Sequence, residues 1–454
     1  MNLVKEMTML LSEDQVSINR TILEQHSKDE SYHRPASPDI VVFPKTAEEV
    51  SKILSFAYEN EIPVVPFGLG TSLEGHAIPY SGGISIDFQL MNQVLEVSPD
   101  DFLVRVQPGI TRSQLNKELK KHGLFFTVDP GADATIGGMA ATNASGTTSV
   151  RYGIMRDQVR EMEVVLADGR IIRAGSKSAK SSSGLHLPGL FVGSEGTLGV
   201  FTELTLRVYG IPEAIIAGRA IFPSLEKAVQ TVFDILSAGI PVARIELLDE
   251  FSVNQFNKFN HAEFEEKPTL FMEFHGNKEG IQYDVDFAGT LALDNDCFEF
   301  LFEKETKKRN ELWEARHNLA YAFVHHSPGK KLMVTDVCVP LSKLAEAILD
   351  ARKEIDLSGL SAAILGHVGD GNYHVILTVD HSDAEEMDRA EKLNAKLVDR
   401  ALELGGTCTG EHGVGVGKAK YQRKEHGAAY EVMKALKKTL DEKNILNPGK
   451  IFAD

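Results

Sequence analysis

The spacing of apolar and polar residues divides the chain into two parts. In the first part, two capping boxes predict helices, and four short apolar runs predict strands. The capping boxes begin at Thr46 and Thr111, and the strands cover residues 62–66, 103–107, 163–166 and 200–208. Residues 130–210 are rich in Gly, Ser, Thr and Ala, a composition typical of short strands joined by tight turns.

The pattern changes after residue 212, where long amphipathic helices alternate with apolar strands. The helices are expected near 224–238, 342–355, 384–404 and 428–443, and the strands at 243–248, 269–275, 332–339, 361–366 and 373–379. This alternation predicts an antiparallel sheet covered by helices on one face. The expected fold class is α+β, with a helical lead-in over residues 1–34, a first domain over 35–212 and a second over 213–454.

Composition narrows the classes of function. The 454 residues are too many for one core, and 43% apolar and 25% charged residues are typical of a globular protein. A formal net charge of −17 argues against a surface for nucleic acid or for an anionic membrane. The three widely spaced cysteines provide no disulfide framework, no Cys-based zinc site and no ligands for iron–sulfur clusters. Without a signal peptide or an apolar run of about 18 residues, we expect a cytoplasmic protein with no transmembrane segment.

Two segments, GHVGDGNYH and the later GEHGVG, carry candidate catalytic chemistry. Their glycines allow tight turns, so that polar side chains can converge on one point. Two imidazoles and a carboxylate, from His367, His374 and Glu411, suffice to bind a divalent ion with positions left open for substrate. His412 would then stand beside the metal as a proton acceptor. A hydrogen-bonded pair of hairpin histidines is the structural alternative.

Three glycine-rich turns lie in the first domain, at residues 67–75, 129–146 and 193–200. Such turns present consecutive backbone N–H groups, which bind a pyrophosphate without positive charge, as an acidic protein requires. The sequence contains no strand–GxGxxG–helix unit and no Walker A lysine, so neither Rossmann nor P-loop binding is indicated. One such loop could be a simple tight turn, but three in one domain favour a nucleotide cofactor.

These turns resemble the FAD-binding domain of the vanillyl-alcohol-oxidase superfamily, through the loop at 64–75 and the segments PGADATIGGMAATNASG and VGSEGTLGVFTELTLR. GHVGDGNYH and GEHGVG are similar to the superfamily's flavin-linked branch of D-lactate, glycolate and D-2-hydroxyglutarate dehydrogenases. The five motifs occur in the family's order and span residues 35–452. The resemblance implies a PCMH-type FAD-binding domain of two α+β subdomains, followed by a domain for substrate and metal.

The resemblance also implies which residues contact FAD. They are Pro66, Gly68, Gly70, Thr71, Ser72, Leu73, Pro130, Gly131, Thr135, Ile136, Gly137, Gly138, Ala141, Thr142, Asn143, Ser145, Gly146, Gly193, Glu195, Gly196, Gly199, Val200, Asn447 and Lys450. Covalent attachment in this superfamily often uses a histidine in the first loop. Residues 70–75 contain none, and His76 lies one residue beyond, so non-covalent FAD is expected.

The catalytic roles implied by the resemblance agree with those suggested by the residues. His367, His374 and Glu411 bind a divalent metal, Zn or Mn, His412 is the base, and Arg316 and Lys331 hold the substrate carboxylate. Asp370 is either a further metal ligand or bonds its own backbone in the turn. Asn372 either contacts the ligand shell or occupies a turn. Lys450 either stabilises negative charge on reduced flavin or is a solvated tail residue.

Two departures from the family pattern bear on the substrate. Enzymes for hydroxyglutarate carry Asn at the position of Ile376 and a small hydroxyl residue at the position of Ala320. Both differences remove a handle for a distal carboxylate. The chain is therefore expected to oxidise a small D-2-hydroxy acid, D-lactate or glycolate, to the 2-keto acid.

The sequence leaves the electron acceptor open between a quinone, a cytochrome, a flavoprotein and an iron–sulfur subunit. The chain would act as a homodimer or within a hetero-complex. One alternative is the flavin subunit of a multi-component glycolate oxidase, in which a separate chain carries the iron–sulfur clusters. Another is a non-redox FAD transferase of the same superfamily, such as an ether-lipid synthase.

Overall fold

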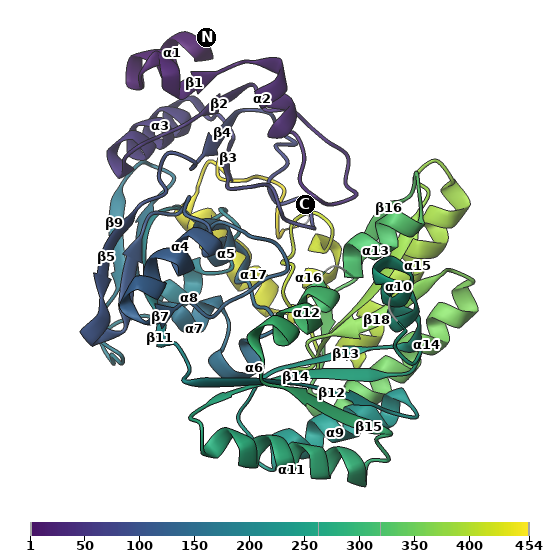
Figure 1. Cartoon of the computed structure of the whole chain (residues 1–454). Helices are drawn as coiled ribbons and strands as arrows, with labels where there is room; N and C mark the ends of the chain where they lie inside the picture. Colours follow the sequence, from purple (N-terminus) through teal and green to yellow (C-terminus); the bar gives the residue numbers. More distant parts are fainter. Residues whose placement is uncertain (1, 262, 318, 453–454) are drawn as a thin grey trace. The chain divides into compact units, whose positions relative to one another are not determined.

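The computed structural model describes residues 2–261, 263–317 and 319–452, without the side chains of residues 314–317, 320 and 321. The chain divides into two compact units, which are considered separately (Figure 1). Unit 1 consists of Met1–Ser145, Gly153–Ile211 and Glu411–Asp454, and unit 2 of Gly146–Tyr152 and Pro212–Gly410. Both units combine helices and sheets, which confirms the predicted α+β class.

Unit 1 contains a four-stranded sheet near its N-terminus, with strand order β1-β2-β4-β3. Its strands are β1 (Val16–Ser17), β2 (Ile40–Val42), β3 (Val64–Phe67) and β4 (Ile84–Asp87), and its helices are α1 (Leu3–Leu10), α2 (Arg20–Gln25) and α3 (Ala47–Asn60). β4 runs parallel to both neighbours, whereas β1 is antiparallel to β2. Thr46 caps α3 by accepting a hydrogen bond from the N–H of Glu49, but the Glu49 carboxylate accepts from the N–H of Lys45 at 2.7 Å, so only half of the predicted capping box forms. The N-terminal lead-in is part of this layer, because Met7 of α1 is buried in its core.

The second sheet of unit 1 is antiparallel, with order β5-β6-β10-β8-β9. Its strands are β5 (Val94–Ser98), β6 (Leu103–Val106), β8 (Val159–Val165), β9 (Ile171–Gly175) and β10 (Val200–Arg207), and β7 (Leu124–Phe125) pairs separately with β11 (Tyr209–Gly210). The accompanying helices are α4 (Arg112–Leu119), α5 (Ile136–Thr142), α7 (Met155–Gln158) and α8 (Leu187–Phe191). The capping box of Thr111 and Gln114 forms at α4.

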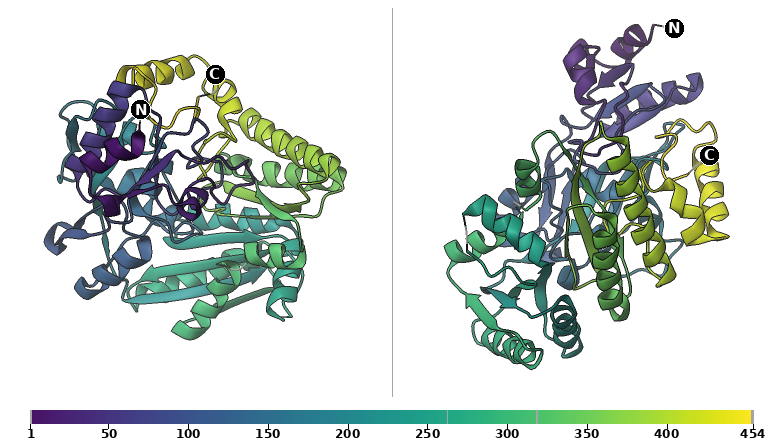
Figure 2. Two further views of the ribbon diagram at one scale, coloured as in Figure 1. Left: turned by 90° about the horizontal axis from the view of Figure 1, so that it is seen from above. Right: turned by 90° about the vertical axis from the view of Figure 1, so that its right-hand side faces the viewer.

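The C-terminal segment of the chain belongs to unit 1; Figure 1 shows it in yellow among purple and blue elements, and Figure 2 shows it from two further sides. It contains α16 (Gln422–His426) and α17 (Ala429–Leu440). The ammonium of Lys437 donates to the carbonyls of Thr197 and Leu446, at 2.9 and 2.8 Å. The N–H of Asn447 donates to the carbonyl of Val64 at 2.8 Å. These contacts attach residues 411–454 to the first part of the chain, whereas the pattern along the sequence grouped them with residues 213–410.

Unit 2 is built on a larger sheet in which all strand pairs are antiparallel. The order is β15-β12-β14-β13-β18-β19-β16, and β17 pairs with β19. The strands are β12 (Ala214–Ile221), β13 (Val242–Leu248), β14 (Thr269–Gly276), β15 (Glu299–Glu303), β16 (Lys331–Val334), β17 (Val337–Cys338), β18 (Ala362–Gly366) and β19 (Asn372–Val379). The helices are α6 (Ser149–Tyr152), α9 (Leu225–Ser237), α10 (Glu250–Asn260), α11 (Gly280–Asp294), α12 (Thr306–His317), α13 (Leu319–His326), α14 (Leu344–Ser358) and α15 (Ala384–Glu403).

Helices cover both faces of this sheet. α9, α11, α14 and α15 form one layer, and α10, α12 and α13 form the other (Figure 1). Ile376 of β19 packs with the second layer, whereas Tyr373 lies buried near Asp350 of α14 and Arg400 of α15. Side chains alternate along a strand, so His374 shares the face of Ile376. The prediction that helices cover one face was therefore incomplete.

Short 3₁₀ helices connect several of these elements. They cover Glu13–Gln15, Pro99–Asp101, Lys120–His122, Leu341–Lys343 and Ala419–Tyr421. Among the described residues, none of the helices has both the length and the apolar composition that a membrane span needs.

Candidate active site

The three glycine-rich loops of unit 1 meet one another, as their predicted common role requires. A Cβ atom on Gly68, in the first loop, would lie 2.4 Å from Oγ1 of Thr135 in the second. The N–H of Glu195, in the third loop, donates to the carbonyl of Ala141 at 2.8 Å. The N–H of Gly193 donates to the carbonyl of Ala140 at 2.9 Å. Glycine at position 68 thus permits a close approach between two loops that are distant in the sequence.

The C-terminal residues predicted to contact FAD join the same loops. The amide of Asn447 donates to the carbonyls of His76 and Glu195, at 3.1 and 2.8 Å. The buried ammonium of Lys450 donates to the carbonyl of Ile78 at 2.7 Å. Burial lowers the pKa of Lys450 to about 8. The Lys450 side chain is therefore buried within the loop cluster, and the alternative of a solvated tail residue is wrong.

The loop cluster fits a dinucleotide cofactor in its chemistry. A Cβ atom on Gly131 would have no neighbour within 4 Å, so the backbone there borders open space. The hydroxyl of Ser194 is buried without a hydrogen-bond partner among the described residues. Other predicted contacts already have protein partners, since the hydroxyl of Ser72 donates to Asp29 at 2.9 Å. Gly146 belongs to unit 2, where its N–H donates to the hydroxyl of Ser149 at 3.0 Å.

Unit 2 brings His367 and His374 together. His367 directly follows β18, and His374 lies within β19, the other strand of the same hairpin. Their ring centroids lie 5.5 Å apart at an interplanar angle of 86°. Both side chains are buried. Nδ1 of His367 is 2.5 Å from a carboxylate oxygen of Glu246, and Nδ1 of His374 is 3.0 Å from the carbonyl of Thr335. With Nδ1 engaged in this way, Nε2 is the nitrogen through which each ring would bind a divalent ion.

Asp336 is a buried carboxylate beside these histidines. Its Oδ1 lies 3.7 Å from Nδ1 of His374 and accepts a hydrogen bond from the amide of Asn372 at 2.8 Å. The hydroxyl of Thr409 donates to its Oδ2 at 2.7 Å. Asn372 also donates to the carbonyl of Val337 at 2.9 Å, so its amide group is fixed within unit 2. Its Oδ1 has no hydrogen-bond partner among the described residues.

The turn between the two histidines depends on glycine. Gly371 has φ of +87°, and a Cβ atom there would lie 2.1 Å from the carbonyl of Val339. Asp370 precedes it, and its N–H lies 3.3 Å from the carbonyl of His367, which closes the turn. Position 371 therefore requires glycine, because any other residue would be strained at this φ and its Cβ atom would collide with the carbonyl of Val339.

Glu411 and His412 begin the C-terminal segment of unit 1. The hydroxyl of Ser145 donates to a carboxylate oxygen of Glu411 at 2.9 Å, and the other carboxylate oxygen is 4.0 Å from Nε2 of His412. Gly410, the preceding residue, lies in unit 2, where a Cβ atom would be 2.0 Å from the amide nitrogen of Asn372. The predicted metal ligands are thus divided between the two units.

Of the two residues predicted to hold the substrate carboxylate, the structure describes the side chain of Lys331 only. Arg316 falls within α12, but its side chain lies outside the described residues, as does the side chain of Ala320. Lys331 is the first residue of β16; its side chain is exposed, and its backbone pairs with Val379 of β19. Ile376 is buried in the apolar cluster beneath α10 and α13.

Two buried carboxylates of this region, Glu246 and Asp336, were missed from the sequence. Neither belongs to a glycine-rich motif, and Glu246 is 121 residues away from the histidine it contacts. The sequence contains only an unspecific indication of these residues, since each is an acidic residue within or just after an apolar strand. Such carboxylates commonly orient the imidazole ligands of metals.

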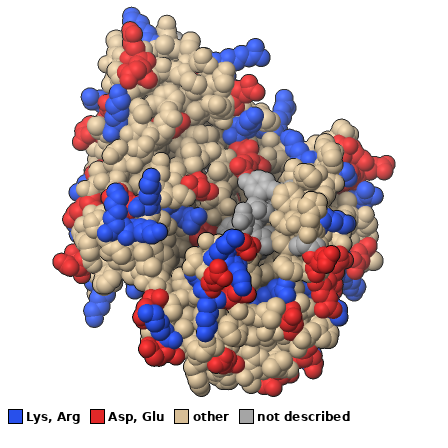
Figure 3. Space-filling model, viewed as in Figure 1, with Lys and Arg blue, Asp and Glu red and all other residues tan. Residues whose placement is uncertain are grey.

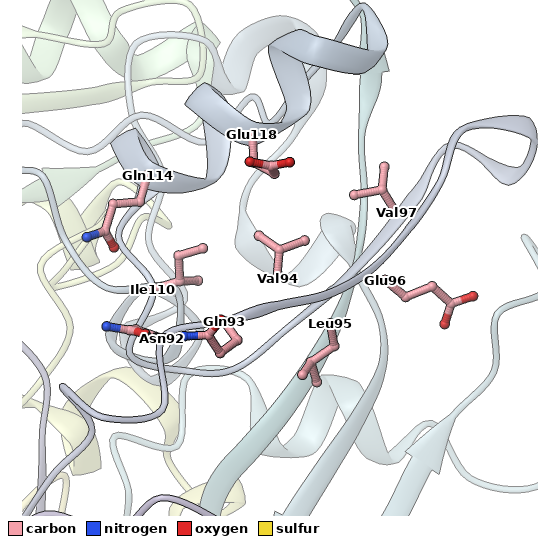
Figure 4. Close-up of a pocket in the computed structure, with 9 residues that line it drawn as sticks. All are labelled: Asn92, Gln93, Val94, Leu95, Glu96, Val97, Ile110, Gln114 and Glu118. Carbon is pink, nitrogen blue, oxygen red and sulfur yellow. Dashed lines mark hydrogen bonds between the residues drawn. The ribbon is translucent and has the colours of Figure 1, made fainter.

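A pocket of about 380 Å³ also lies in unit 1, between β5 and α4 (Figure 4). Its lining comprises Asn92, Gln93, Val94, Leu95, Glu96, Val97, Ile110, Gln114 and Glu118, none of which is a predicted site residue. On the face drawn in Figure 3, acidic and basic side chains are both spread over the surface.

Comparisons with known proteins identify two families along the chain. The family of FAD linked oxidases, C-terminal domain, matches residues 211–451, and the FAD binding domain family matches residues 38–175. The chain is 44% identical to the probable mitochondrial D-lactate dehydrogenase of Danio rerio, over 99% of this chain and 91% of that protein. It is 44% identical to the mitochondrial D-lactate dehydrogenase [cytochrome] of Arabidopsis thaliana, over 94% of this chain and 76% of that protein.

A further relative is the glycolate oxidase subunit GlcD of Bacillus subtilis, 37% identical over 94% of this chain and 92% of that protein. Solved structures with the same fold include a p-cresol methylhydroxylase, with a TM-score of 0.80 and 17% identity, covering 99% of this chain and 96% of that one. An alkyldihydroxyacetonephosphate synthase has a TM-score of 0.79 and 22% identity, covering 98% of this chain and 85% of that one. The family matches agree with the loop cluster of unit 1, and the chain belongs to the family of FAD-linked oxidases.

Proposed function

We propose that this protein is an FAD- and metal-dependent dehydrogenase that oxidises a small D-2-hydroxy acid, D-lactate or glycolate, to the 2-keto acid. The buried pair His367 and His374, each held through Nδ1, is the observation that carries the proposal. Flavin binding does not require two buried histidines. A metal ion that binds the substrate requires protein ligands of this kind. The D-lactate dehydrogenases and the glycolate oxidase subunit among the relatives support the same reaction class.

Each protein group has a defined task in this reaction. His367, His374 and Glu411 would hold a divalent ion, Zn or Mn, whose charge would lower the pKa of the substrate hydroxyl. His412 accepts the hydroxyl proton as general base. FAD, when bound, would supply an acceptor for the hydride of the substrate carbon and a route for the electrons to a separate acceptor.

The choice between substrates with one and two carboxylates depends on which protein groups can bind each carboxylate. Arg316 and Lys331 would hold the carboxylate next to the reacting carbon. Ile376, on the face of β19 that carries His374, offers only apolar surface. A second, distal carboxylate would lose its hydration there without gaining a hydrogen bond, which favours a monocarboxylic substrate.

Anaerobic mixing with candidate substrates tests this proposal. D-Lactate or glycolate should bleach the flavin absorbance, while L-lactate and D-2-hydroxyglutarate should act far more slowly. Absence of bleaching by every 2-hydroxy acid would contradict the proposed reaction. It would favour the non-redox transferase that the fold also accommodates, since an alkyldihydroxyacetonephosphate synthase shares this fold.

A second candidate is the flavin subunit of a multi-component glycolate oxidase, which the relative GlcD favours. Turnover of the isolated chain with an artificial dye would identify a self-sufficient dehydrogenase. Turnover that appears only with a partner chain would identify a subunit. A cytoplasmic location and a homodimer or hetero-complex remain predictions, and two relatives are named as mitochondrial.

The flavin is expected to be non-covalent. Acid precipitation of the purified protein should release it into the supernatant, because residues 70–75 contain no histidine to form a covalent bond with the flavin. His76, the nearest histidine, is buried 3.3 Å from a carboxylate oxygen of Glu195. Flavin that stays in the protein pellet and survives proteolysis on a peptide would contradict this expectation.

Arg316→Lys is expected to raise KM for D-lactate about ten- to hundred-fold with FAD content unchanged. A guanidinium offers two parallel donors to a carboxylate, and losing one charge-assisted hydrogen bond costs about 1.5–3 kcal/mol. Steady-state kinetics with D-lactate should be compared with lactamide, which lacks the carboxylate charge. An equal change for both compounds, or none for either, would remove Arg316 from the clamp, since an exposed helix charge tolerates lysine.

A further inference from the structure

Glu195, in the third glycine-rich loop of unit 1, binds the backbone of the GEHGVG segment. Its Oε1 accepts a hydrogen bond from the N–H of Val414 at 2.6 Å, and its Oε2 accepts one from the N–H of Gly415 at 2.8 Å. The residue is only 5% exposed, and its φ of +53° lies in the left-handed region. The N–H groups of two successive residues thus donate to the two oxygens of one buried carboxylate.

The surroundings leave the turn little freedom. Gly413 has φ of +84°, and a Cβ atom there would lie 2.6 Å from Nε2 of His76 and 2.8 Å from Oε1 of Glu195. Nε2 of His76 is 3.3 Å from the same carboxylate oxygen. Burial opposes a charge on His76, but the carboxylates of Glu195, Asp29 and Glu74 together outweigh that effect and raise the pKa of His76. Gly413 is therefore enclosed by the side chains of His76 and Glu195, which leave no room for a Cβ atom.

A second acidic residue, Glu74, holds the far side of the turn. Its carbonyl accepts a hydrogen bond from the N–H of Val416 at 2.9 Å. A Cβ atom on Gly415 would lie 2.0 Å from that carbonyl. The Glu74 carboxylate is 3.4 Å from the ammonium of Lys418. Residues 413–418 thus contact the first and third glycine-rich loops through Glu74 and Glu195. The hydrogen bonds that Glu195 accepts from Val414 and Gly415 are the nearest of these to His412 along the chain.

We propose that Glu195 is a positioning residue, whose carboxylate fixes the turn after His412 so that the base keeps one orientation. The inference rests on the proposed role of His412, which is bonded directly to Gly413. The carboxylate would act through the loop backbone and not on the flavin. The side chain belongs to a loop predicted to contact FAD, and through its carboxylate it holds the segment that carries the proton acceptor.

Glu195→Gln tests the proposal, because the amide keeps the size of the side chain but replaces one acceptor with a donor. Hydrogen–deuterium exchange in peptides covering 411–418 should become about ten- to hundred-fold faster, the effect of losing one charge-assisted hydrogen bond. Flavin reduction by D-lactate, calculated per bound flavin, should slow at least about tenfold. FAD content and KM should stay unchanged, which a general loss of structure would not allow.

Glu163→Gln is the matched control. Glu163 is a buried glutamate of unit 1 that accepts hydrogen bonds from Thr202 and Arg173, at 3.0 and 2.8 Å. Its substitution should leave exchange in residues 411–418 unchanged. If Glu195→Gln fails to fold, Glu195→Asp provides the same measurements, since it keeps the charge but is too short to reach both N–H groups.

Two results would overturn the proposal. One is unchanged exchange over residues 411–418 in the folded variants. The other is loss of FAD with an unchanged reduction rate per remaining flavin, which would make Glu195 a cofactor-binding residue only. Failure of the wild-type protein to oxidise any 2-hydroxy acid would contradict the proposed function, while the exchange measurement would still decide whether Glu195 fixes the turn.

Discussion

Glu411→Gln is expected to remove the bound divalent ion and nearly all turnover while FAD stays bound. Glutamine keeps the length and shape of the side chain but loses the anionic oxygen that a divalent ion prefers. Ser145 donates a hydrogen bond to the Glu411 carboxylate at 2.9 Å, and an amide oxygen can still accept it, so the local backbone should be retained. The effect should therefore fall on the metal and not on the fold.

Metal analysis of the purified variant and of the wild type measures this effect directly. Flavin absorbance reports FAD content in the same samples. Glu442→Gln, an exposed glutamate in the same segment, controls for the loss of one negative charge. An active wild type that contains no divalent ion would refute the ligand assignment of His367, His374 and Glu411. If the variant has the metal content of the wild type, Glu411 is not a metal ligand, and the assignment of His367 and His374 is unaffected.

The helices that could be predicted carry their signals locally. Thr111 and Gln114 form the capping box that the sequence indicates, and α4 begins at the next residue after Thr111. α9, α14 and α15 were predicted because apolar residues recur at helical spacing over many turns. Such features depend on neighbours within a few residues, so a single sequence contains them.

Elements that depend on distant partners could not be predicted in the same way. β15 is the edge strand of the unit 2 sheet, and its exposed Leu301 and Phe302 follow no clear alternation. α11 contains Gly289, which packs against Phe300 of β15 and interrupts the apolar pattern. The position of residues 411–454 in unit 1 depends on Lys437, whose partners include Thr197, 240 residues away in the sequence.

The candidate site shows the same division. The histidines of GHVGDGNYH could be predicted to meet because one short turn joins them, and unit 2 places their rings 5.5 Å apart. The Glu246 carboxylate that orients His367 comes from another strand, β13, and no motif marks it. Glu195 could be assigned to the FAD loops from its motif, but the bonds of its side chain to Val414 and Gly415 required the structure.

His412→Ala is expected to slow flavin reduction by D-lactate about 10²–10⁴-fold, the usual contribution of a general base. Substrate binding should weaken far less, because the residues proposed to hold the substrate carboxylate and the metal remain. His412 lies in a turn whose backbone is held by Glu195 and Glu74, so removing the imidazole should leave the loop in place. Rapid-mixing measurement of the flavin absorbance gives the reduction rate and the apparent substrate affinity in one experiment.

Two comparisons separate a base from a structural residue. His122→Ala removes an exposed histidine of unit 1 and should leave the reduction rate unchanged. Added imidazole should partly restore reduction in His412→Ala, because a small base can enter the space that the side chain leaves and accept the hydroxyl proton. A variant with the wild-type reduction rate would reassign His412 to structure. A slow variant that imidazole does not improve, with faster amide exchange across residues 411–418, would indicate that the loop and not the proton transfer has failed.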